Sequence, residues 1–364
     1  MKNMLRYAEL ILLGVLIVAG IILWLLLWMS KGKIMPLRDA AGNIIEGSIS
    51  QRCYTEINGV KNGMFIQGKN TDNPVLLLVS SGPGTPDYFL TEAYPKMNLA
   101  DYYTICYWEY RGACLSYDSK ADLKTITTEQ LVSDTAEITR YLMERFHKDK
   151  IYIMGFSGGS YIALKTAAVH PELYEAYFGM AQMICQGPDN DTLIYNFMHS
   201  CFSERKDTGR LKRLESLVTH LPNGQVMTND WMRFCALLHE AGGGTIKDKT
   251  EFTSIVIPLL KSKCYTLGEK INYIRGLKAY SKTPLYQEMW ENDFRKSLPS
   301  VDIPVYFLSG EYDYNCPWRL VQEYCEMLDA PVKGFYSFSD SAHSPLWEQP
   351  KETIEVLKNV LTQS

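Results

Sequence analysis

The spacing of apolar and polar positions divides the chain into regions of different period. Near the N-terminus, Leu10 to Met29 form an apolar run of twenty residues without a charge. As an α-helix, such a run extends roughly 30 Å at ~1.5 Å per residue, which matches the hydrocarbon thickness of a bilayer. Trp24 and Trp28 lie toward one end, where interfacial aromatic residues are favoured. The pattern predicts a helix that crosses a membrane once.

The flanks of this run bear on processing and orientation. A cleaved signal peptide has a shorter apolar region and a cleavage site of small residues, and segment 29–33 offers no such site. We therefore expect an uncleaved anchor in the cell membrane, with its flank ending near residue 35. Basic residues stand on both sides of the run, so the positive-inside rule leaves the side of the catalytic domain open. They are Lys2 and Arg6 before it, and Lys31, Lys33 and Arg38 after it.

After a linker, the period changes to that of strands alternating with helices. A hairpin is expected over residues 48–67, with its turn at Asn58-Gly59. Buried strands are expected at 75–79, 103–108, 151–154 and 176–180, and a helix is expected to begin near Thr127. Strand–helix alternation favours an α/β fold with a mainly parallel sheet. Residues 36–182 would form the first part of this core and residues 300–364 its second part.

Between residues 183 and 299 the strand period stops. This stretch reads mostly as helix, so we expect a helical cap inserted after the sixth core strand. Its aromatic residues could wall an apolar pocket or only pack the cap helices against each other. They are Phe197, Phe202, Trp231, Phe234, Tyr265, Tyr273, Tyr286 and Trp290.

Composition narrows the classes of function. The net charge of −4 and the lack of a Lys/Arg cluster argue against nucleic-acid binding. Nine cysteines are scattered without CxxC pairs, which argues against zinc and against a disulfide framework and mildly favours a reducing compartment. No P-loop or GxGxxG motif is present, so we expect no metal and no cofactor. The sequence leaves the oligomeric state open.

The candidate chemistry centres on Gly155-Phe156-Ser157-Gly158-Gly159-Ser160. Strand residues precede this Gly-x-Ser-x-Gly motif and a helical stretch follows it. A serine on such a strand-to-helix turn can expose its hydroxyl, and the next backbone N–H, that of Gly158, points to where an oxyanion would form. Ser157 is therefore the candidate nucleophile, although a Gly-rich turn without chemistry has the same pattern.

A serine nucleophile needs a base and an orienting acid. Of the six histidines, His343 follows a predicted strand at 334–338 and lies on a loop, whereas the other five lie in or beside helical patterns. The loop after the predicted strand 305–309 carries two acids, Glu311 and Asp313. A second oxyanion donor is expected after the strand 75–79, where Gly82 is the candidate because Pro83 has no N–H.

In this order, the motifs resemble the α/β-hydrolase fold and its prolyl iminopeptidase branch. That branch carries His-Gly-Gly-Pro-Gly where this chain has residues 80–84, with serines in place of the first His and Gly, and Asp-x-Arg-Gly where it has Glu109 to Gly112. Its acid motif, Gly-x-Tyr-Asp-x-x-Cys/Thr-Pro, is matched over residues 310–317, and its Gly-His-Ser by Ala342-His343-Ser344. The likeness covers about residues 50–360.

The resemblance implies Ser157, Asp313 and His343 as a catalytic triad, with Gly82 and Gly158 as backbone oxyanion donors. It also implies helices on both faces of the sheet and cap acids that read the free amine of a peptide. The motif does not identify those acids among the four available. They are Glu204, Glu240, Glu288 and Glu291.

The sequence is compatible with three alternative functions. The first is a membrane-anchored aminopeptidase that releases N-terminal residues, such as proline, from short peptides. The second is a carboxylesterase or lipid-ester hydrolase, for which a bilayer contact through residues 10–29 would bring the site near its substrate. The third is a non-catalytic scaffold with the same fold, which the ordered motifs disfavour.

Overall fold

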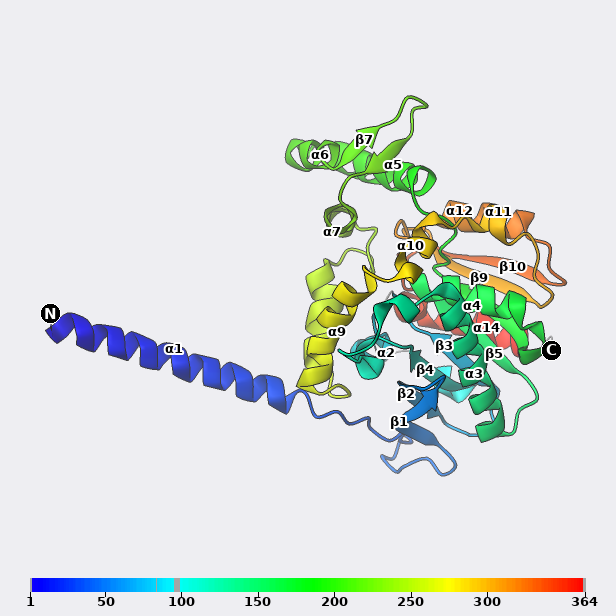
Figure 1. Cartoon of the computed structure of the whole chain (residues 1–364), viewed down its shortest axis with the longest axis horizontal. Helices are drawn as coiled ribbons and strands as arrows, with labels where there is room; N and C mark the ends of the chain where they lie inside the picture. Colours follow the sequence, from blue (N-terminus) through cyan, green and yellow to red (C-terminus); the bar gives the residue numbers. More distant parts are fainter. Residues whose placement is uncertain (1, 83, 95–98, 363–364) are drawn as a thin grey trace.

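A long helix projects from an α/β domain (Figure 1). The computed structural model describes residues 2–82, 84–94 and 99–362. The projecting helix, α1 (Lys2–Trp28), contains the segment Glu9–Trp28, which is long and apolar enough to cross a membrane. Signal sequences share this property, so the helix alone does not identify an anchor.

The domain is built on one eight-stranded sheet with the order β1-β2-β4-β3-β5-β6-β9-β10. The hairpin strands β1 and β2 and their neighbour β4 pair antiparallel, and the other pairs are parallel. The strands are β1 (Ile49–Ile57), β2 (Val60–Gly68), β3 (Val75–Val79), β4 (Thr104–Glu109), β5 (Ile151–Phe156), β6 (Tyr174–Met180), β9 (Val305–Gly310) and β10 (Lys333–Phe338). The predicted α/β-hydrolase fold with its mainly parallel sheet is confirmed.

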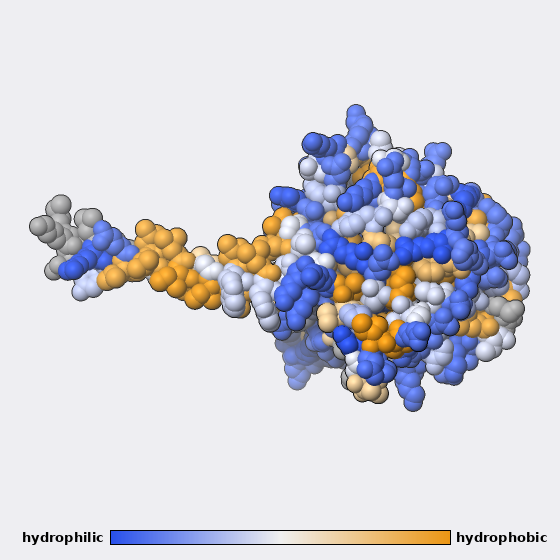
Figure 2. All heavy atoms as spheres, turned by 90° about the horizontal axis from the view of Figure 1, so that it is seen from below, coloured by the Kyte–Doolittle hydropathy of each residue, from blue (hydrophilic) through white to orange (hydrophobic). Residues whose placement is uncertain are grey.

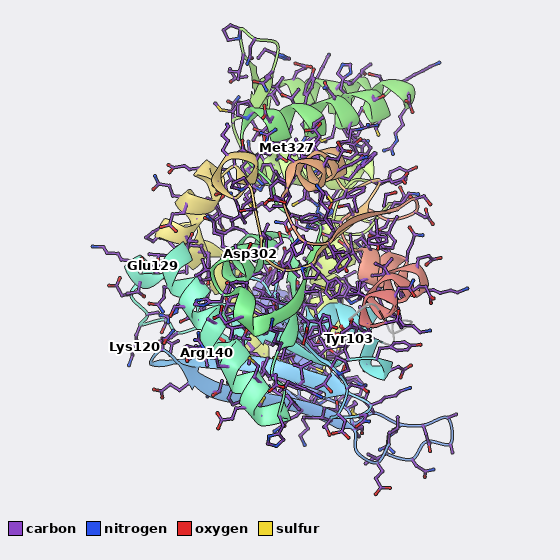
Figure 3. All side chains as sticks on the ribbon, turned by 90° about the vertical axis from the view of Figure 1, so that its right-hand side faces the viewer. Tyr103, Lys120, Glu129, Arg140, Asp302 and Met327 are labelled. Atoms are coloured by element: carbon purple, nitrogen blue, oxygen red, sulfur yellow. The ribbon has the colours of Figure 1, made fainter. Side chains whose placement is uncertain are left out.

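Helices cover both faces of the sheet. Strands β3 and β5 are buried along their whole length, which explains why they read as continuous apolar runs. On one face lie α3 (Thr128–Phe146), α4 (Gly158–Val169) and α12 (Trp318–Met327). On the other lie α2 (Tyr88–Ala93), α13 (Pro345–Glu348) and α14 (Pro350–Leu361). Figure 3 shows α3 crossing its face, with Glu129 and Arg140 marking its course.

Between β6 and β9 the chain leaves the sheet and forms a mostly helical layer. It also contains a short antiparallel hairpin, β7 (Val218–His220) and β8 (Val226–Thr228), in a region that the pattern assigned to helix. Three residues per strand are too few for an alternating pattern to stand out. The helices are α5 (Pro188–Glu204), α6 (Thr208–Glu215), α7 (Trp231–Ala241), the π-helix η5 (Phe252–Val256), α8 (Ile257–Lys261), α9 (Leu267–Tyr280), α10 (Pro284–Glu291) and α11 (Phe294–Ser297).

Candidate active site

The turn between β5 and α4 holds Ser157 in an unusual backbone conformation. Its φ of 53° and ψ of −126° are rarely adopted by a residue with a side chain. Crowding explains the glycines beside it, because a Cβ at Gly158 would stand 2.5 Å from the carbonyl oxygen of Gly82. The turn therefore brings the backbone after Ser157 against the loop that follows β3.

Two loops at the ends of β9 and β10 bring an acid and an imidazole to this serine. His343 Nε2 lies 2.8 Å from Ser157 Oγ, and His343 Nδ1 lies 3.0 Å from each carboxylate oxygen of Asp313. Asp313 is fully buried and also accepts a hydrogen bond from the N–H of Cys316 at 3.0 Å. The ring of Phe156 packs against the imidazole of His343, with the two ring centres 5.3 Å apart.

Glu311, the alternative acid, is not part of this hydrogen-bond chain. Its side chain is exposed and accepts a hydrogen bond from Ser337 Oγ at 2.9 Å. Although they are only two residues apart, Asp313 contacts the imidazole and Glu311 lies in solvent. Of the two acids on this loop, only Asp313 meets His343.

The two candidate oxyanion donors face an open space. In the described parts of the chain, neither the Gly82 N–H nor the Gly158 N–H has a hydrogen-bond partner. The loop before them is fixed because Ser81 donates to Asp87 through its N–H, at 2.6 Å, and through its hydroxyl. Pro83, the residue between Gly82 and Gly84 in this loop, lies outside the described residues.

Sequence reasoning missed Asp87 as a site residue. This carboxyl group lines the cavity beside Ser157 and is buried, and burial raises its pKa to about 7. Among the described residues, it is the only carboxylate that lines the cavity. Its place shortly after the Gly-Pro-Gly loop is the one sequence signal that could have identified it.

His239 is one of the five histidines that lie in or beside helical patterns. It is buried in α7 and lines the same cavity as His343. Burial lowers the pKa of its imidazole to about 4, so this side chain is neutral at physiological pH. It lies in a helical pattern and therefore carried no sequence signal that set it apart.

The cavity over Ser157 has a volume of about 490 Å³ and mainly apolar walls. Four of the eight aromatic residues considered from the sequence line it, namely Trp231, Tyr273, Tyr286 and Trp290. Phe197, Phe202 and Phe234 instead pack in the cap, and Tyr265 packs against the core. In the described parts of the chain, no cluster of His, Cys, Asp or Glu side chains could hold a metal ion.

None of the four cap acids reaches the cavity. Glu240 pairs with Arg210 and Arg213 on the protein surface. Glu288 accepts a hydrogen bond from the N–H of Thr128, and Glu291 accepts one from Gln287. Glu204 bonds to Ser200 within its own helix. The cavity therefore offers no cap carboxylate to a substrate amine.

Comparison with known proteins gives one sequence relative and many structural ones. No protein-family model matches the chain. The chain is 30% identical over 294 residues to a Bacillus subtilis (strain 168) protein named "Probable aminopeptidase YbaC", covering 81% of this chain and 91% of that protein. Proline iminopeptidase from Mycobacterium smegmatis has a TM-score of 0.56 at 16% identity, over 86% of this chain and 98% of its own. A membrane phospholipase A has a TM-score of 0.55 at 16% identity, over 100% and 99%. These two structures support the fold alone.

Proposed function

This chain belongs to the proline iminopeptidase-like α/β hydrolases, and we propose that it is a membrane-anchored serine hydrolase that works through an acyl-enzyme. The observation that carries the proposal is the hydrogen-bond chain from Ser157 through His343 to Asp313. Its three members come from separate loops at one end of the sheet, as an acyl-transfer triad requires. We further propose that residues 1–35 are the anchor and its flank, that 36–182 and 300–364 are the core, and that 183–299 are the cap.

In this mechanism Ser157 Oγ attacks the substrate carbonyl while His343 Nε2 takes its proton. Asp313 holds the imidazole in the required tautomer and stabilises the imidazolium. The negative charge that develops on the carbonyl oxygen faces the N–H groups of Gly82 and Gly158. His343 then returns the proton to the leaving group, and water cleaves the acyl-enzyme by the same steps in reverse.

A fluorophosphonate probe tests the nucleophile. We expect the wild-type protein to be labelled and Ser157→Ala to remain unlabelled, with turnover reduced by several orders of magnitude, since the members of a triad act as a unit. The neighbouring Ser160→Ala variant is the matched control, because Ser160 Oγ bonds to backbone and does not touch His343. Equal labelling of wild type and Ser157→Ala would assign the reaction to another residue.

Two substrate classes remain, each with its own support. The name of the sequence relative and the motifs favour release of N-terminal residues from short peptides. The apolar cavity without a cap carboxylate favours an ester or another acyl substrate that has no free amine. A panel of prolyl amides and of esters with increasing chain length separates the two. Turnover of the amide alone would support the peptidase, and turnover that rises with acyl length would support the esterase.

Extraction tests the anchor. We expect the full-length protein to stay in the membrane fraction after a carbonate wash, because residues 10–28 of α1 are apolar on every side and are not buried against the domain. Mass spectrometry of the mature protein should show that it still contains residues 10–29. A soluble protein, or one that begins after residue 29, would contradict the anchor and leave the serine chemistry untouched.

A further inference from the structure

The residues that follow α1 are hydrogen-bonded to the first turn of helix α9 and to the segment just before it. Lys270 Nζ donates hydrogen bonds to the carbonyl oxygen of Met29 at 3.1 Å and to Ser30 Oγ at 3.0 Å. The N–H of Lys33 donates to the carbonyl oxygen of Lys263 at 3.0 Å. Lys270 is buried, so this junction is part of the packed domain rather than a free linker. The position of α1 therefore fixes how the domain is turned relative to a membrane.

Trp28 marks the level of the membrane surface on the domain. The ammonium groups of Lys31 and Lys263 lie 5.5 and 5.3 Å from the centre of its indole ring. Tryptophan at the end of a spanning helix sits at headgroup depth, where lysine meets phosphate groups. Lys263 belongs to the turn between α8 and α9, so that part of the domain lies at the same depth.

The elements next to this junction carry exposed apolar side chains. Phe252 is 60% exposed in η5, and on α9 Ile271 is 43% and Ile274 is 56% exposed. Figure 1 shows α9 running across the side of the domain from which α1 leaves, and Figure 2 shows the apolar surface of α1 continuing up to that side. We call Phe252, Lys263, Ile271 and Ile274 the membrane-facing surface.

The inner sides of the same elements line the cavity over Ser157. Ile255 of η5 and Tyr273, Leu277 and Lys278 of α9 are lining residues. An acyl chain that enters between η5 and α9 would thus meet apolar side chains from the surface to the serine. Lys278, at the mouth, carries a positive charge that suits an anionic headgroup.

We propose that this membrane-facing surface rests on the bilayer and admits a membrane-dissolved acyl ester to Ser157 between η5 and α9. The proposal rests on the anchored serine hydrolase proposed above and deepens it, because it names both the source and the class of the substrate. Helix α1 keeps the domain near the membrane, and the membrane-facing surface orients the entrance of the cavity toward the bilayer. A substrate in water would need neither exposed apolar helices nor a fixed end of α1.

Photocrosslinking tests the surface without using catalysis. A photoreactive aryl-ketone amino acid replaces Phe252, Ile274 or Met327 in the full-length protein, reconstituted in vesicles of phosphatidylcholine and phosphatidylglycerol. Met327 is the matched control, because it is 60% exposed like Phe252 but lies at the end of α12, on another side of the domain (Figures 1 and 3). We expect lipid adducts at 252 and 274 and none at 327. Equal yields at all three positions, or none at 252 and 274, would overturn the proposal.

Hydrolysis tests the route. In Phe252→Asp/Ile274→Asp, we expect turnover of a long-chain ester embedded in those vesicles to fall about tenfold, because surface binding scales with buried apolar area. Turnover of a water-soluble short ester and fluorophosphonate labelling should stay at wild-type levels, and Met327→Asp should change neither rate. Equal loss on both esters, or no loss on the vesicle ester, would contradict the route. A wild-type protein that the probe does not label would instead reject the serine chemistry, while the crosslinking result would still stand.

Discussion

At the scale of single residues, the two acids after β9 give a direct comparison. We expect Asp313→Asn to lower kcat by about 10⁴-fold, because an amide cannot hold the imidazole in the reactive tautomer. Glu311→Gln should retain wild-type activity, since the carboxylate of Glu311 is exposed and, in the described structure, accepts a hydrogen bond only from Ser337. Steady-state kinetics of the two purified variants decide the point. The reverse ranking would move the orienting acid to Glu311.

The contact between Gly158 and Gly82 predicts a second effect. In Gly158→Ala the new methyl group would stand 2.5 Å from the carbonyl oxygen of Gly82 and displace the oxyanion loop. We expect kcat to fall by about 100- to 1000-fold, as for the loss of one oxyanion donor, with KM changed little. Gly209→Ala is the matched control, because a Cβ there would meet only Asp207, at 3.5 Å. A Gly158→Ala enzyme with normal kcat would contradict the predicted displacement of the oxyanion loop.

Asp87 predicts a pH dependence of stability. Its pKa is raised by burial to about 7, above the ordinary 3.8, so the folded protein holds this proton to a higher pH than the unfolded chain does. The free energy of unfolding contributed by this group therefore falls as the pH rises from about 4 to about 7, and is constant above. The total change is on the order of 4 kcal/mol at most, from ~1.4 kcal/mol per pKa unit.

Asp87→Asn should remove this dependence. Denaturant unfolding at pH 5 and pH 8 should show that wild type loses more stability between the two values than the variant does. The Asn side chain can still accept a hydrogen bond from Ser81, so the loop keeps one of its contacts. An identical pH dependence in both proteins would mean that Asp87 is ionised throughout this range.

At the scale of elements, the cap aromatics set the length of the cavity. The rings of Tyr286 and Trp290 in α10 are stacked with their centres 4.5 Å apart, and the ring of Trp231 in α7 packs edge-on against Trp290 with the centres 5.6 Å apart. We expect Trp290→Ala to open the cavity and to shift the kcat/KM optimum toward longer acyl chains. Phe234→Ala, inside the cap cluster, should lower the melting temperature and leave that optimum unchanged. A series of esters with increasing chain length measures the optimum of each variant, and thermal unfolding measures the melting temperature. An unchanged optimum in Trp290→Ala would show that Trp290 does not limit the length of the acyl chain.

The same elements show what the sequence could predict. Strands β3 and β5 were readable because burial on both faces makes every position apolar, and Ser157 was readable because its turn needs glycines in fixed places. The β7–β8 hairpin was not readable because three residues do not establish a period. Asp87 and His239 were missed because the burial that perturbs their pKa values comes from segments distant in sequence. The roles of the site residues stay predictions until the variants are measured.

At the scale of the whole molecule, the junction at Lys270 predicts where the chain can be shortened. A variant without residues 2–28 keeps all three acceptors of Lys270, whereas one without residues 2–34 loses Met29 and Ser30 and keeps only the Leu260 carbonyl oxygen. We expect the shorter variant to be less stable by about 1–3 kcal/mol, because a buried ammonium group loses two of its three hydrogen-bond partners. Thermal unfolding gives the melting temperatures of the two variants, and activity on a soluble ester shows that both are folded. Equal melting temperatures would show that residues 29–34 do not hold the domain.

The order in which the site residues occur along the chain has a consequence for biosynthesis. Ser157 lies before the cap, whereas Asp313 and His343 follow β9 and β10, the last strands of the sheet. Because chains fold from the N-terminus as they are made, the ribosome releases the serine turn well before the acid and the base exist. For the proposed triad, we therefore expect a nascent or prematurely terminated chain to carry an inert serine. We expect hydrolytic activity to begin only when the final strands join the sheet, after translation of nearly the whole protein.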